Sequence, residues 1–267
     1  YHHIIKGLYA TFSSWHIDHS TFNTQHSTFN NLLLFLKLFT EISCGFENKV
    51  VTLRHGYLIQ MIMKYLDPKA DLTFKKIFGN HPKRLISLLN ALLPLSEEEQ
   101  IHEIEYLPTE LVPQLEGGKN TIVDVLCTDA RGRKFCVEMQ MEWSDAFQQR
   151  VLFYASKLYV SQAKKGGKYS ELQPVYSLNL VNDIFAHDTP DFIHNYRIVH
   201  DKDSSKVIKG LHFTFIELPK FTPHSIADKR MMVLWLRFLT EINSNTKEIP
   251  SDLLNDPEIG KAVEELE

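Results

Sequence analysis

Asn120–Trp143, NTIVDVLCTDARGRKFCVEMQMEW, contains two runs of apolar and β-branched residues around a short polar segment that includes Gly132. Apolar runs that flank a glycine-containing turn are typical of a β-hairpin. Asp124 lies in the first run, and Glu138 and Gln140 lie in the second. The predicted hairpin therefore carries polar groups in strands that are otherwise apolar, and its register decides whether these groups meet.

The register of this hairpin depends on the length of its turn. Successive side chains of a strand point to opposite faces, so Glu138 and Gln140 share one face. A two-residue turn would place Asp124 opposite Met139, whereas a three-residue loop ending at Gly132 places it opposite Glu138. Such a loop commonly closes with a residue in the left-handed region, which glycine adopts without steric cost. We therefore expect Asp124, Glu138 and Gln140 to cluster.

A cluster of acids in an apolar strand has two interpretations. In the first, these side chains simply point to water from the solvated face of a hairpin. In the second, two close carboxylates are held together by a proton or a cation, and hard oxygen ligands suit Mg²⁺ or Mn²⁺. Glu138 lies in the apolar run Phe135–Met141, and Asp124 lies between two valines. Acids with buried neighbours need a compensating partner, which favours the second interpretation.

Several motifs resemble those of one nuclease family. Asp124, followed by Glu138-Met139-Gln140 on the next strand, resembles the signature of PD-(D/E)XK nucleases, with Gln in place of the final Lys. The segment Tyr65–Gly79, YLDPKADLTFKKIFG, resembles the opening of the Rpn family of recombination-promoting nucleases or transposases. Later segments follow the order of the same family, and the resemblance covers roughly residues 63–240: Gln149–Tyr154, Gly167–Tyr169 and Pro174–Tyr176.

This resemblance implies an α/β fold with a restriction-endonuclease-like PD-(D/E)XK core, in which helices flank a central mixed β-sheet. It implies a Mg²⁺-dependent DNA endonuclease that hydrolyses phosphodiester bonds in recombination or transposition, with DNA as its partner. Asp124 and Glu138 would bind Mg²⁺, or Mn²⁺ in its place, with the backbone carbonyl of Met139 as a further ligand. Gln140 would orient the attacking water, so Asp124, Glu138 and Gln140 are the expected catalytic residues.

The Gln in the motif is its main departure from the usual pattern. Lysine contributes a positive charge to the transition state, and the neutral amide of Gln140 does not. Either another cation such as Lys75 compensates, or activity is lower, or a second metal is used. Because the family as a whole has this Gln, it does not by itself imply an inactive enzyme. The competing hypotheses are a catalytically degenerate nuclease fold that binds nucleic acid or a protein, and a purely structural α/β domain.

Four further residues on predicted helices are candidates for the site: Asp71, Lys75, Arg150 and Tyr154. Asp71 could be a third acid near the metal, but Asp is a preferred N-cap residue and we favour a cap. Lys75 could contact a phosphate or be solvated. Arg150 and Tyr154 lie four residues apart on one side of their helix. Arg150 either binds a phosphate with both arms of its guanidinium or pairs with an acid beside a core tyrosine, and the sequence leaves both open.

The composition is that of a globular protein, with 267 residues of which 43% are hydrophobic and 23% charged, which allows one sizeable core. The formal net charge is −4, so DNA contacts would have to rest on local basic patches and metal ions. Cys44, Cys127 and Cys136 suggest no disulfide framework and fit a cytoplasmic protein; the last two should face opposite sides. The apolar run Leu32–Phe39 is too short for a membrane span, so we expect no membrane partner. The sequence leaves open a homo-oligomer.

We predict three parts along the chain. Residues 1–62, with a repeated His-Ser-Thr-Phe-Asn, are expected to be a low-complexity or mistranslated, poorly ordered extension whose histidines lack a metal-binding framework. Residues 63–242 form the nuclease domain, and residues 243–267 form a helical tail that is truncated. The expected helices are Asp71–Gly79, a second from Pro82 to before Pro94, Ala146–Lys165 with Ser144 or Asp145 as cap, and Ala227–Ile242; the expected strands are Ile101–Leu107, Pro174–Val181, Tyr196–His200 and Leu211–Leu218, and Leu111–Lys119 is a loop.

Overall fold

The structure is a computed structural model, and it describes residues 65–111, 121–223 and 230–267. The predictions for residues 1–62, and most of the predicted loop Leu111–Lys119, lie outside the described residues. The division of the chain at residues 62 and 242 therefore remains a prediction.

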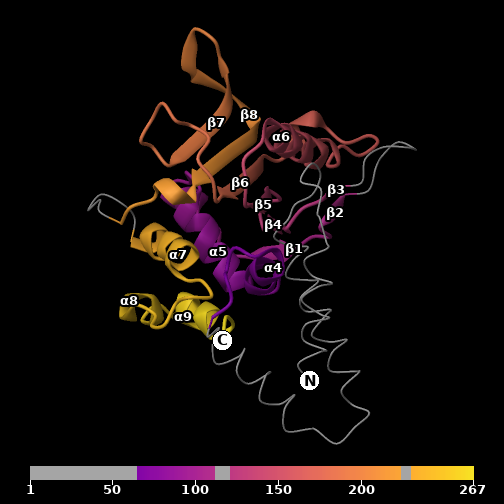
Figure 1. Ribbon diagram of the computed structural model, residues 1–267. Coiled ribbons are helices and arrows are strands. Elements are labelled where there is room, and N and C mark those ends of the chain that lie inside the picture. The colour runs from indigo at the N-terminus through magenta and orange to yellow at the C-terminus, as the bar shows by residue number, and fades with distance from the viewer. Residues whose placement is uncertain (1–64, 112–120, 224–229) are drawn as a thin grey trace, which may run out of the picture. The chain divides into compact units, whose positions relative to one another are not determined.

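The main sheet comprises β1 (Ile104–Tyr106), β4 (Val125–Asp129), β5 (Lys134–Gln140), β6 (Val175–Val181), β7 (Ile193–His200) and β8 (Asp203–Glu217). Its six strands have the order β1-β4-β5-β6-β8-β7 (Figure 1). Strands β5, β6 and β8 are parallel, whereas the pairs β1–β4, β4–β5 and β7–β8 are antiparallel. Two short strands, β2 (Glu110–Leu111) and β3 (Thr121–Ile122), pair separately.

Helices cover both faces of this mixed sheet (Figure 1). One face packs against α4 (Asp71–Gly79), α5 (Pro82–Leu92), α7 (Arg230–Glu241), α8 (Ser251–Leu254) and α9 (Pro257–Glu264). The other face packs against α6 (Asp145–Val160). The prediction of an α/β fold with a central mixed sheet flanked by helices is confirmed. Within the described ranges, no helix has both the length and the apolar character needed to cross a membrane.

The loop between β4 and β5 fixes the register of the hairpin. Val125 pairs with Val137, and three residues ending at Gly132 form the loop. Gly132 has a φ of +81° and supplies the left-handed residue that such a loop requires. The predicted three-residue loop is confirmed, and its register brings Asp124 next to Glu138.

A buried ion pair closes this loop from within. The guanidinium of Arg133 donates to Oδ2 of Asp129 over 2.7 Å, and the backbone N–H groups of Arg131 and Arg133 donate to Oδ1 over 3.1 and 2.9 Å. Arg133 also donates to the backbone carbonyl of Glu99 over 2.8 Å. Because every carboxylate oxygen of Asp129 has a donor, this buried charge is compensated where it lies.

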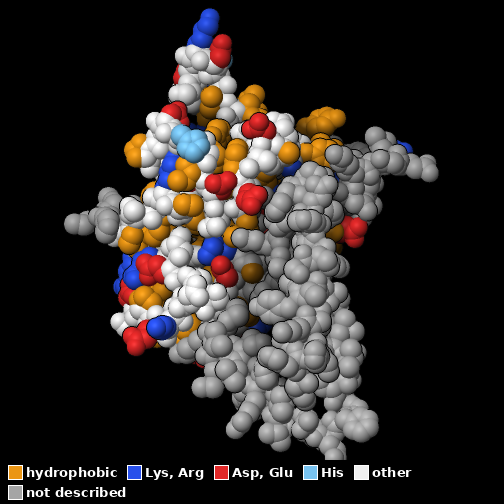
Figure 2. Space-filling view, in the orientation of Figure 1, with side chains coloured by type: hydrophobic (Ala, Val, Ile, Leu, Met, Phe, Trp, Pro, Cys, Tyr) orange, Lys and Arg blue, Asp and Glu red, His pale blue; other side chains and the backbone are white. Residues whose placement is uncertain are grey.

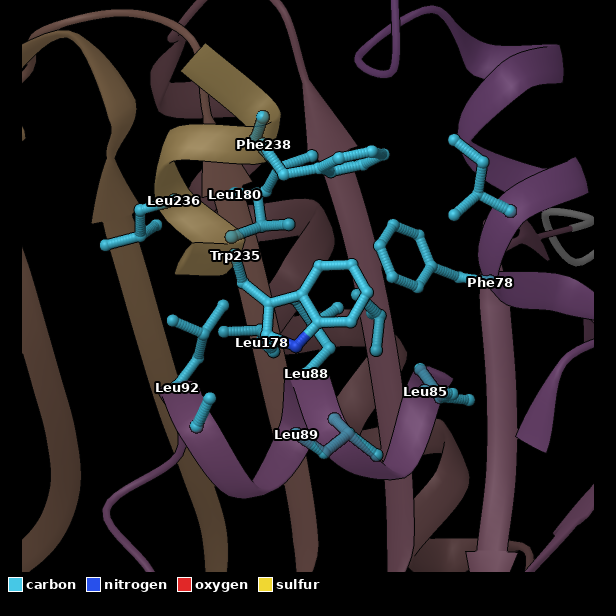
Figure 3. Close-up of a cluster of buried hydrophobic side chains, with 14 of the residues drawn as sticks. Phe78, Leu85, Leu88, Leu89, Leu92, Leu178, Leu180, Trp235, Leu236 and Phe238 are labelled. Carbon is cyan, nitrogen blue, oxygen red and sulfur yellow. The ribbon is translucent and has the colours of Figure 1, made fainter. Parts of the chain in front are cut away.

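The larger core lies between the sheet and α4, α5, α7 and α9 (Figure 3). At its centre the fully buried ring of Trp235 contacts Phe78 at 5.4 Å and Phe238 at 5.6 Å between centroids. The indole N–H of Trp235 donates to the hydroxyl of Ser87 over 2.9 Å, which satisfies its polar atom. The inner faces of α5 and α7 are buried here, with Met231 partly buried: Leu85, Leu88, Leu89, Leu92, Leu234, Trp235, Phe238 and Leu239.

Helix α6 forms a smaller core on the opposite face. The hydroxyl of Ser144 accepts a hydrogen bond of 3.2 Å from a backbone N–H of the first turn, so the predicted cap is confirmed. The helix ends at Val160, so the predicted end at Lys165 is wrong. Beyond the helix, the side-chain amide of Gln162 bonds the backbone of Gln173 twice, over 2.9 and 3.1 Å, and turns the chain towards β6.

The two cysteines of the hairpin face opposite sides of the sheet, as predicted. Cys127 lies in the larger core and Cys136 lies in the smaller one, and neither is in a disulfide. Burial, with a contribution from the charge of Asp129, raises the pKa of Cys127 to about 12. Burial also raises the pKa of Cys136 well above its usual value. Both thiols are therefore structural rather than nucleophilic.

The remaining strands occupy the predicted segments, with one large difference in length. β1 lies at the edge of the sheet within the predicted strand, and β6 begins at Val175. β7 begins at Ile193 rather than Tyr196. β8 begins at Asp203 rather than Leu211, because it continues beyond the sheet as a ribbon paired with β7. The ribbon is exposed on both faces, so it lacks the apolar alternation that marks a half-buried strand.

The C-terminal residues pack onto the same core as α4 and α5. Ile259 and Val263 of α9 are buried in the larger core. The N–H of Leu66 donates to the carbonyl of Leu266 over 2.8 Å, and the guanidinium of Arg84 lies 2.9 Å from the carboxylate of Glu265. These contacts join the two ends of the described chain.

Replacing Gly132 with Ala should lower the free energy of unfolding by about 1–2 kcal/mol, because an L-residue in the left-handed conformation costs roughly this much. The added Cβ would also lie 3.2 Å from Cγ of Gln173. Gly79→Ala is the matched control, because an added Cβ there meets nothing within 4 Å. Urea denaturation followed by tryptophan fluorescence compares the two variants. A Gly132→Ala variant as stable as the wild type would contradict the observed loop conformation.

Candidate active site

Two acids meet where β4 begins and β5 ends. Asp124 lies at a bend one residue before β4, and not inside the strand as the sequence predicted, whereas Glu138 lies within β5. The backbone N–H of Asp124 donates to Oε1 of Glu138 over 3.3 Å, and the N–H of Met139 donates to Oδ2 of Asp124 over 2.9 Å. Glu138 is 5% exposed and the side chain of Asp124 is 14% exposed. The two acids therefore lie side by side in a largely buried position.

The surroundings of these acids favour their protonated forms. The pKa of Glu138 is raised to about 8: burial is the largest cause, the charge of Asp124 adds to it, and the charges of Arg150 and Lys75 act against this shift. Burial also raises the pKa of Asp124, against the hydrogen bond from Met139 and the charge of Lys75. Two carboxylates in one buried place cannot both ionise without a compensating cation. The nearby cations therefore do not supply enough positive charge for both acids of the pair to ionise.

Lys75 of α4 supplies part of the missing positive charge. Its ammonium lies 2.6 Å from Oδ1 of Asp71 and 3.1 Å from Oδ1 of Asp124. Burial alone would lower the pKa of Lys75, but the hydrogen bond to Asp71 and the charge and hydrogen bond of Asp124 raise it. Lys75 is therefore charged and bridges the two aspartates.

The predicted helix cap at Asp71 is wrong. Ala70 occupies the N-cap position, and the side chain of Asp71 makes no capping hydrogen bond. Asp71 is instead the first helical residue, and its carboxylate pairs with Lys75 one turn later. The structure thus places Asp71 beside the acid pair, linked to Asp124 through Lys75, as in the alternative interpretation of a third acid near the site.

Gln140 and Arg150 contact each other at the other side of the acid pair. The guanidinium of Arg150 donates to Oε1 of Gln140 over 2.8 Å, and Nε2 of Gln140 donates to the carbonyl of Glu142 over 2.7 Å. One of the two alternatives for Arg150 was a pair with an acid. Arg150 instead bonds the amide oxygen of Gln140, although its charge lowers the pKa of Glu138. Its guanidinium is exposed and lies 5.1 Å from the centre of the Phe147 ring.

Tyr154 belongs to the smaller core rather than to the open side of the site. It is buried with Leu126 and Cys136. Burial raises the pKa of Tyr154, and the charge of Arg150 lowers it. Arg150 lies 6.0 Å from its ring centre. The packing therefore agrees with the alternative in which Tyr154 is a tyrosine of the core.

A family model described as PD-(D/E)XK nuclease family transposase matches residues 68–267. The chain belongs to this family. Its fold and its motifs agree with this assignment, so the resemblance inferred from Tyr65–Gly79 and from the hairpin is confirmed. Membership gives the chain a role related to nucleases and transposases. No curated protein matches the chain, and no solved structure matches it.

The oxygen atoms at the acid pair fit a hard divalent cation. Asp124 and Glu138 offer carboxylates, and the backbone carbonyl of Met139 is adjacent in sequence. Within the part of the chain that the structure describes, no group of three or more His, Cys, Asp and Glu side chains is arranged to hold a metal ion. Mg²⁺ commonly binds one or two carboxylates and takes its other ligands from water and substrate phosphates. Such an ion would supply the positive charge that the raised pKa of Glu138 shows to be lacking.

Sequence reasoning missed a second buried acid at the same end of the sheet. Glu217, at the end of β8, is fully buried, and its carboxylate accepts hydrogen bonds from the N–H groups of Phe185 and Ala186 over 2.6 and 3.0 Å. The ring of Phe185 in turn stacks on Trp143 at 4.0 Å. Glu217 therefore holds the loop that supports the chain just after Gln140. The available signal was an acid that directly follows an apolar strand.

Replacing Glu138 with Gln should remove a pH dependence of stability. Since the pKa of Glu138 is raised from 4.5 to about 8 by folding, the folded chain binds more protons than the unfolded chain between these values. The free energy of unfolding of the wild type should fall as pH rises through this window, by roughly 1.4 kcal/mol for each unit of the shift. Glu138→Gln should lack this fall and be the more stable protein above about pH 8.

Urea denaturation at a series of pH values, in EDTA, measures this difference, with Glu103→Gln at an exposed position as control. The control should follow the wild type. Parallel profiles for the wild type and Glu138→Gln would show that the carboxyl of Glu138 ionises as it does in the unfolded chain, and would contradict the buried acid pair. Added Mg²⁺ should raise the stability of the wild type above about pH 8 and leave Glu138→Gln unchanged.

Proposed function

We propose that the protein is a Mg²⁺-dependent DNA endonuclease that hydrolyses phosphodiester bonds in recombination or transposition, and that Mn²⁺ can replace Mg²⁺. The observation that carries this proposal is the contact of Asp124 with Glu138. The nearby cations do not compensate two ionised carboxylates in this buried place, so the pair is suited to a divalent ion. The family assignment supports DNA as the substrate. A cytoplasmic location belongs to the same proposal.

Asp124 and Glu138 would hold the ion, together with the carbonyl of Met139. Bound Mg²⁺ lowers the pKa of a coordinated water and stabilises the charge of the scissile phosphate. The raised pKa of Glu138 means that this side chain must release its proton before it can be a ligand. Metal binding and activity should therefore both increase as pH rises towards about 8.

Lys75 and Gln140 together would replace the final lysine of the usual PD-(D/E)XK motif. Lys75 carries a full positive charge, and Asp71 fixes its position within 3.1 Å of Asp124. This charge can stabilise the transition state electrostatically, which Gln140 cannot do. The amide nitrogen of Gln140 has two hydrogens, one of which bonds the carbonyl of Glu142. The other can bond a water molecule and orient it.

Arg150 completes the proposed site as a phosphate contact. Its guanidinium is exposed, and Gln140 and the ring of Phe147 hold it in place. A guanidinium has five N–H donors, so the bond to Gln140 leaves donors for a phosphate oxygen. Tyr154 lies beneath it and supports its position.

The wild type should cleave supercoiled plasmid DNA with Mg²⁺ or Mn²⁺ and not in EDTA. Asp124→Ala and Glu138→Ala should each lower the rate by more than about 10²-fold, because each removes a charged group that acts on the transition state. Asp188→Ala, at an exposed position of the loop after β6, is the control and should cleave normally. Equal cleavage by Asp124→Ala would exclude this site. Binding of DNA without cleavage, with either metal, would favour the catalytically degenerate nuclease fold.

Lys75→Met should lower kcat by about 10²-fold, the effect of removing one group that stabilises transition-state charge. The same change should tighten binding of Mn²⁺, because the ammonium repels a cation at Asp124. The neighbouring Lys76→Met is the control, since the ammonium of Lys76 bonds the carbonyl of Glu265 at 3.1 Å and lies away from the acids. Steady-state kinetics and calorimetric titration of Mn²⁺ measure the two effects. A fall in kcat without tighter binding of Mn²⁺ would show that the ammonium of Lys75 does not lie beside a metal ion at Asp124.

A further inference from the structure

We call residues 195–209 the arm. Its first three residues still pair with β8 inside the sheet, and residues 198–209 continue past the sheet as a two-stranded ribbon. The arm forms the projection at the top of Figure 1. All of its residues are exposed except Asp203 and Val207, which are partly buried. An isolated pair of strands that buries so little apolar surface is marginally stable in water. The arm therefore contributes little to the core, and its exposed side chains are free to contact a partner.

The apolar side chains of the arm serve the arm itself. Ile198 pairs with Ile208, and Val199 pairs with Val207. Such cross-strand pairs of β-branched residues stabilise a ribbon. Neighbouring residues of one strand point to opposite faces, so the two pairs lie on opposite faces and form no single apolar patch. The exposed apolar residues therefore do not mark a hydrophobic docking face.

The arm is basic in a chain whose formal net charge is −4. Of its two acids, Asp203 pairs with Lys206 at 3.4 Å and accepts hydrogen bonds from Ser205, whereas Asp201 is exposed. Among the described residues, no ion pair includes the three other cations of the arm, Arg197, Lys202 and Lys209. In Figure 2 a basic side chain stands at the tip of the projection, beside an acidic one.

One cation of the arm, Arg197, lies next to a stack of two rings where the arm joins the sheet. Arg197 lies opposite His212 in the register of β7 and β8, and the ring of His212 stacks on Tyr176 at 4.6 Å. Burial lowers the pKa of His212, and the charges of Arg197 and Lys209 lower it further, with Glu99 acting against them. The lowered pKa keeps His212 neutral near pH 7, so the positive charge in this region comes from the arm itself.

We propose that the arm binds the sugar–phosphate backbone of duplex DNA outside the cleavage site. A strip of cations without acidic partners complements the phosphate charge, and a two-stranded ribbon has the width of a DNA groove. The proposal rests on the proposed function, which supplies the DNA. Contacts of this kind carry affinity and register rather than sequence specificity.

The distance along β8 places this contact beyond the cleaved bond. Glu138 is level with Phe215 of β8 through the pairing of β5, β6 and β8, and the arm ends at Lys209. Six residues of strand correspond to about 20 Å, at roughly 3.3 Å per residue. This length equals about six steps of a duplex at 3.4 Å per step. The arm therefore contacts DNA several base pairs from the acid pair.

A second copy of the chain is the competing partner, because β7 is the outer strand of the sheet and has an open edge. Two features oppose pairing through this edge. The register shifts between Arg197 and Ile198 and between Val199 and His200, and such irregularities interrupt the ladder that a second strand would need. Arg197 would also bring like charges together across the new interface. DNA is therefore the better occupant.

The test compares two triple variants of the full chain that lose the same charge. Fluorescence anisotropy in EDTA measures binding of a 30-base-pair duplex at a series of salt concentrations. This duplex is about five times as long as the distance estimated above. The arm variant carries Arg197→Gln, Lys202→Gln and Lys209→Gln, the three arm cations outside the ion pair with Asp203. The control carries Lys83→Gln, Lys247→Gln and Lys261→Gln at exposed positions outside the arm. A second control, Arg197→Lys with Lys202→Arg and Lys209→Arg, keeps the charge of the arm.

The arm variant should bind DNA more than about tenfold more weakly at low salt, and its salt slope should be smaller by about 2.7, or 0.9 for each lost phosphate contact. Both controls should bind as the wild type does. Equal affinity and slope in the arm variant and the Gln control would overturn the proposal. A change in the mass of the assembly by light scattering, with DNA affinity unchanged, would also overturn it and assign the arm to contact between copies.

A small phosphodiester substrate separates this proposal from the proposed function. Hydrolysis of bis(p-nitrophenyl) phosphate with Mn²⁺ needs the acid pair but does not reach the arm. The arm variant should hydrolyse it at the wild-type rate, and a slower rate would overturn a role confined to binding. If the wild type hydrolyses neither this substrate nor DNA, the proposed nuclease fails. Weaker DNA binding by the arm variant would still support the arm as the DNA contact.

Discussion

The register of β4 against β5 is the constraint on which the site depends. Because side chains alternate between the two faces of a strand, a slip of one residue would move Glu138 from the face of α6 to the face of α4. The left-handed Gly132 and the buried pair of Asp129 with Arg133 fix the loop from both sides. The sequence of a surface loop thus determines whether two acids at the other end of the hairpin can meet.

The charges around the acid pair come from helices on opposite faces of the sheet. Lys75 reaches Asp124 from α4, which packs in the larger core, and Arg150 approaches Glu138 from α6, which packs in the smaller core. The bend at Asp124 allows this, since its carboxylate lies just outside the strand. The acids remain short of positive charge even so, because burial outweighs both cations at Glu138. A pair of acids that can ionise fully only beside a further positive charge is suited to a divalent ion.

Local sequence was sufficient wherever a single element carried its own signal. The sequence predicted both ends of α4, Asp71 and Gly79, and it gave Ser144 as a candidate cap for the start of α6. The glycine in the hairpin loop predicted its length and, through it, the neighbourhood of Asp124 and Glu138. In each case the signal and the structure lie within a few residues of each other, so tertiary contacts had nothing to override.

The sequence by itself determined the hairpin register and the acids that lie together, because turn chemistry is local, and its resemblance to a known family gave the fold class. Only the tertiary structure decided how the acids are charged. Asp71 pairs with Lys75 instead of capping its helix, and Arg150 donates to the amide oxygen of Gln140. These partners lie far apart in the chain or depend on how a helix is rotated against the sheet, and the pKa of Glu138 depends on the water that packing excludes. None of these quantities is carried by the spacing of residues along a chain.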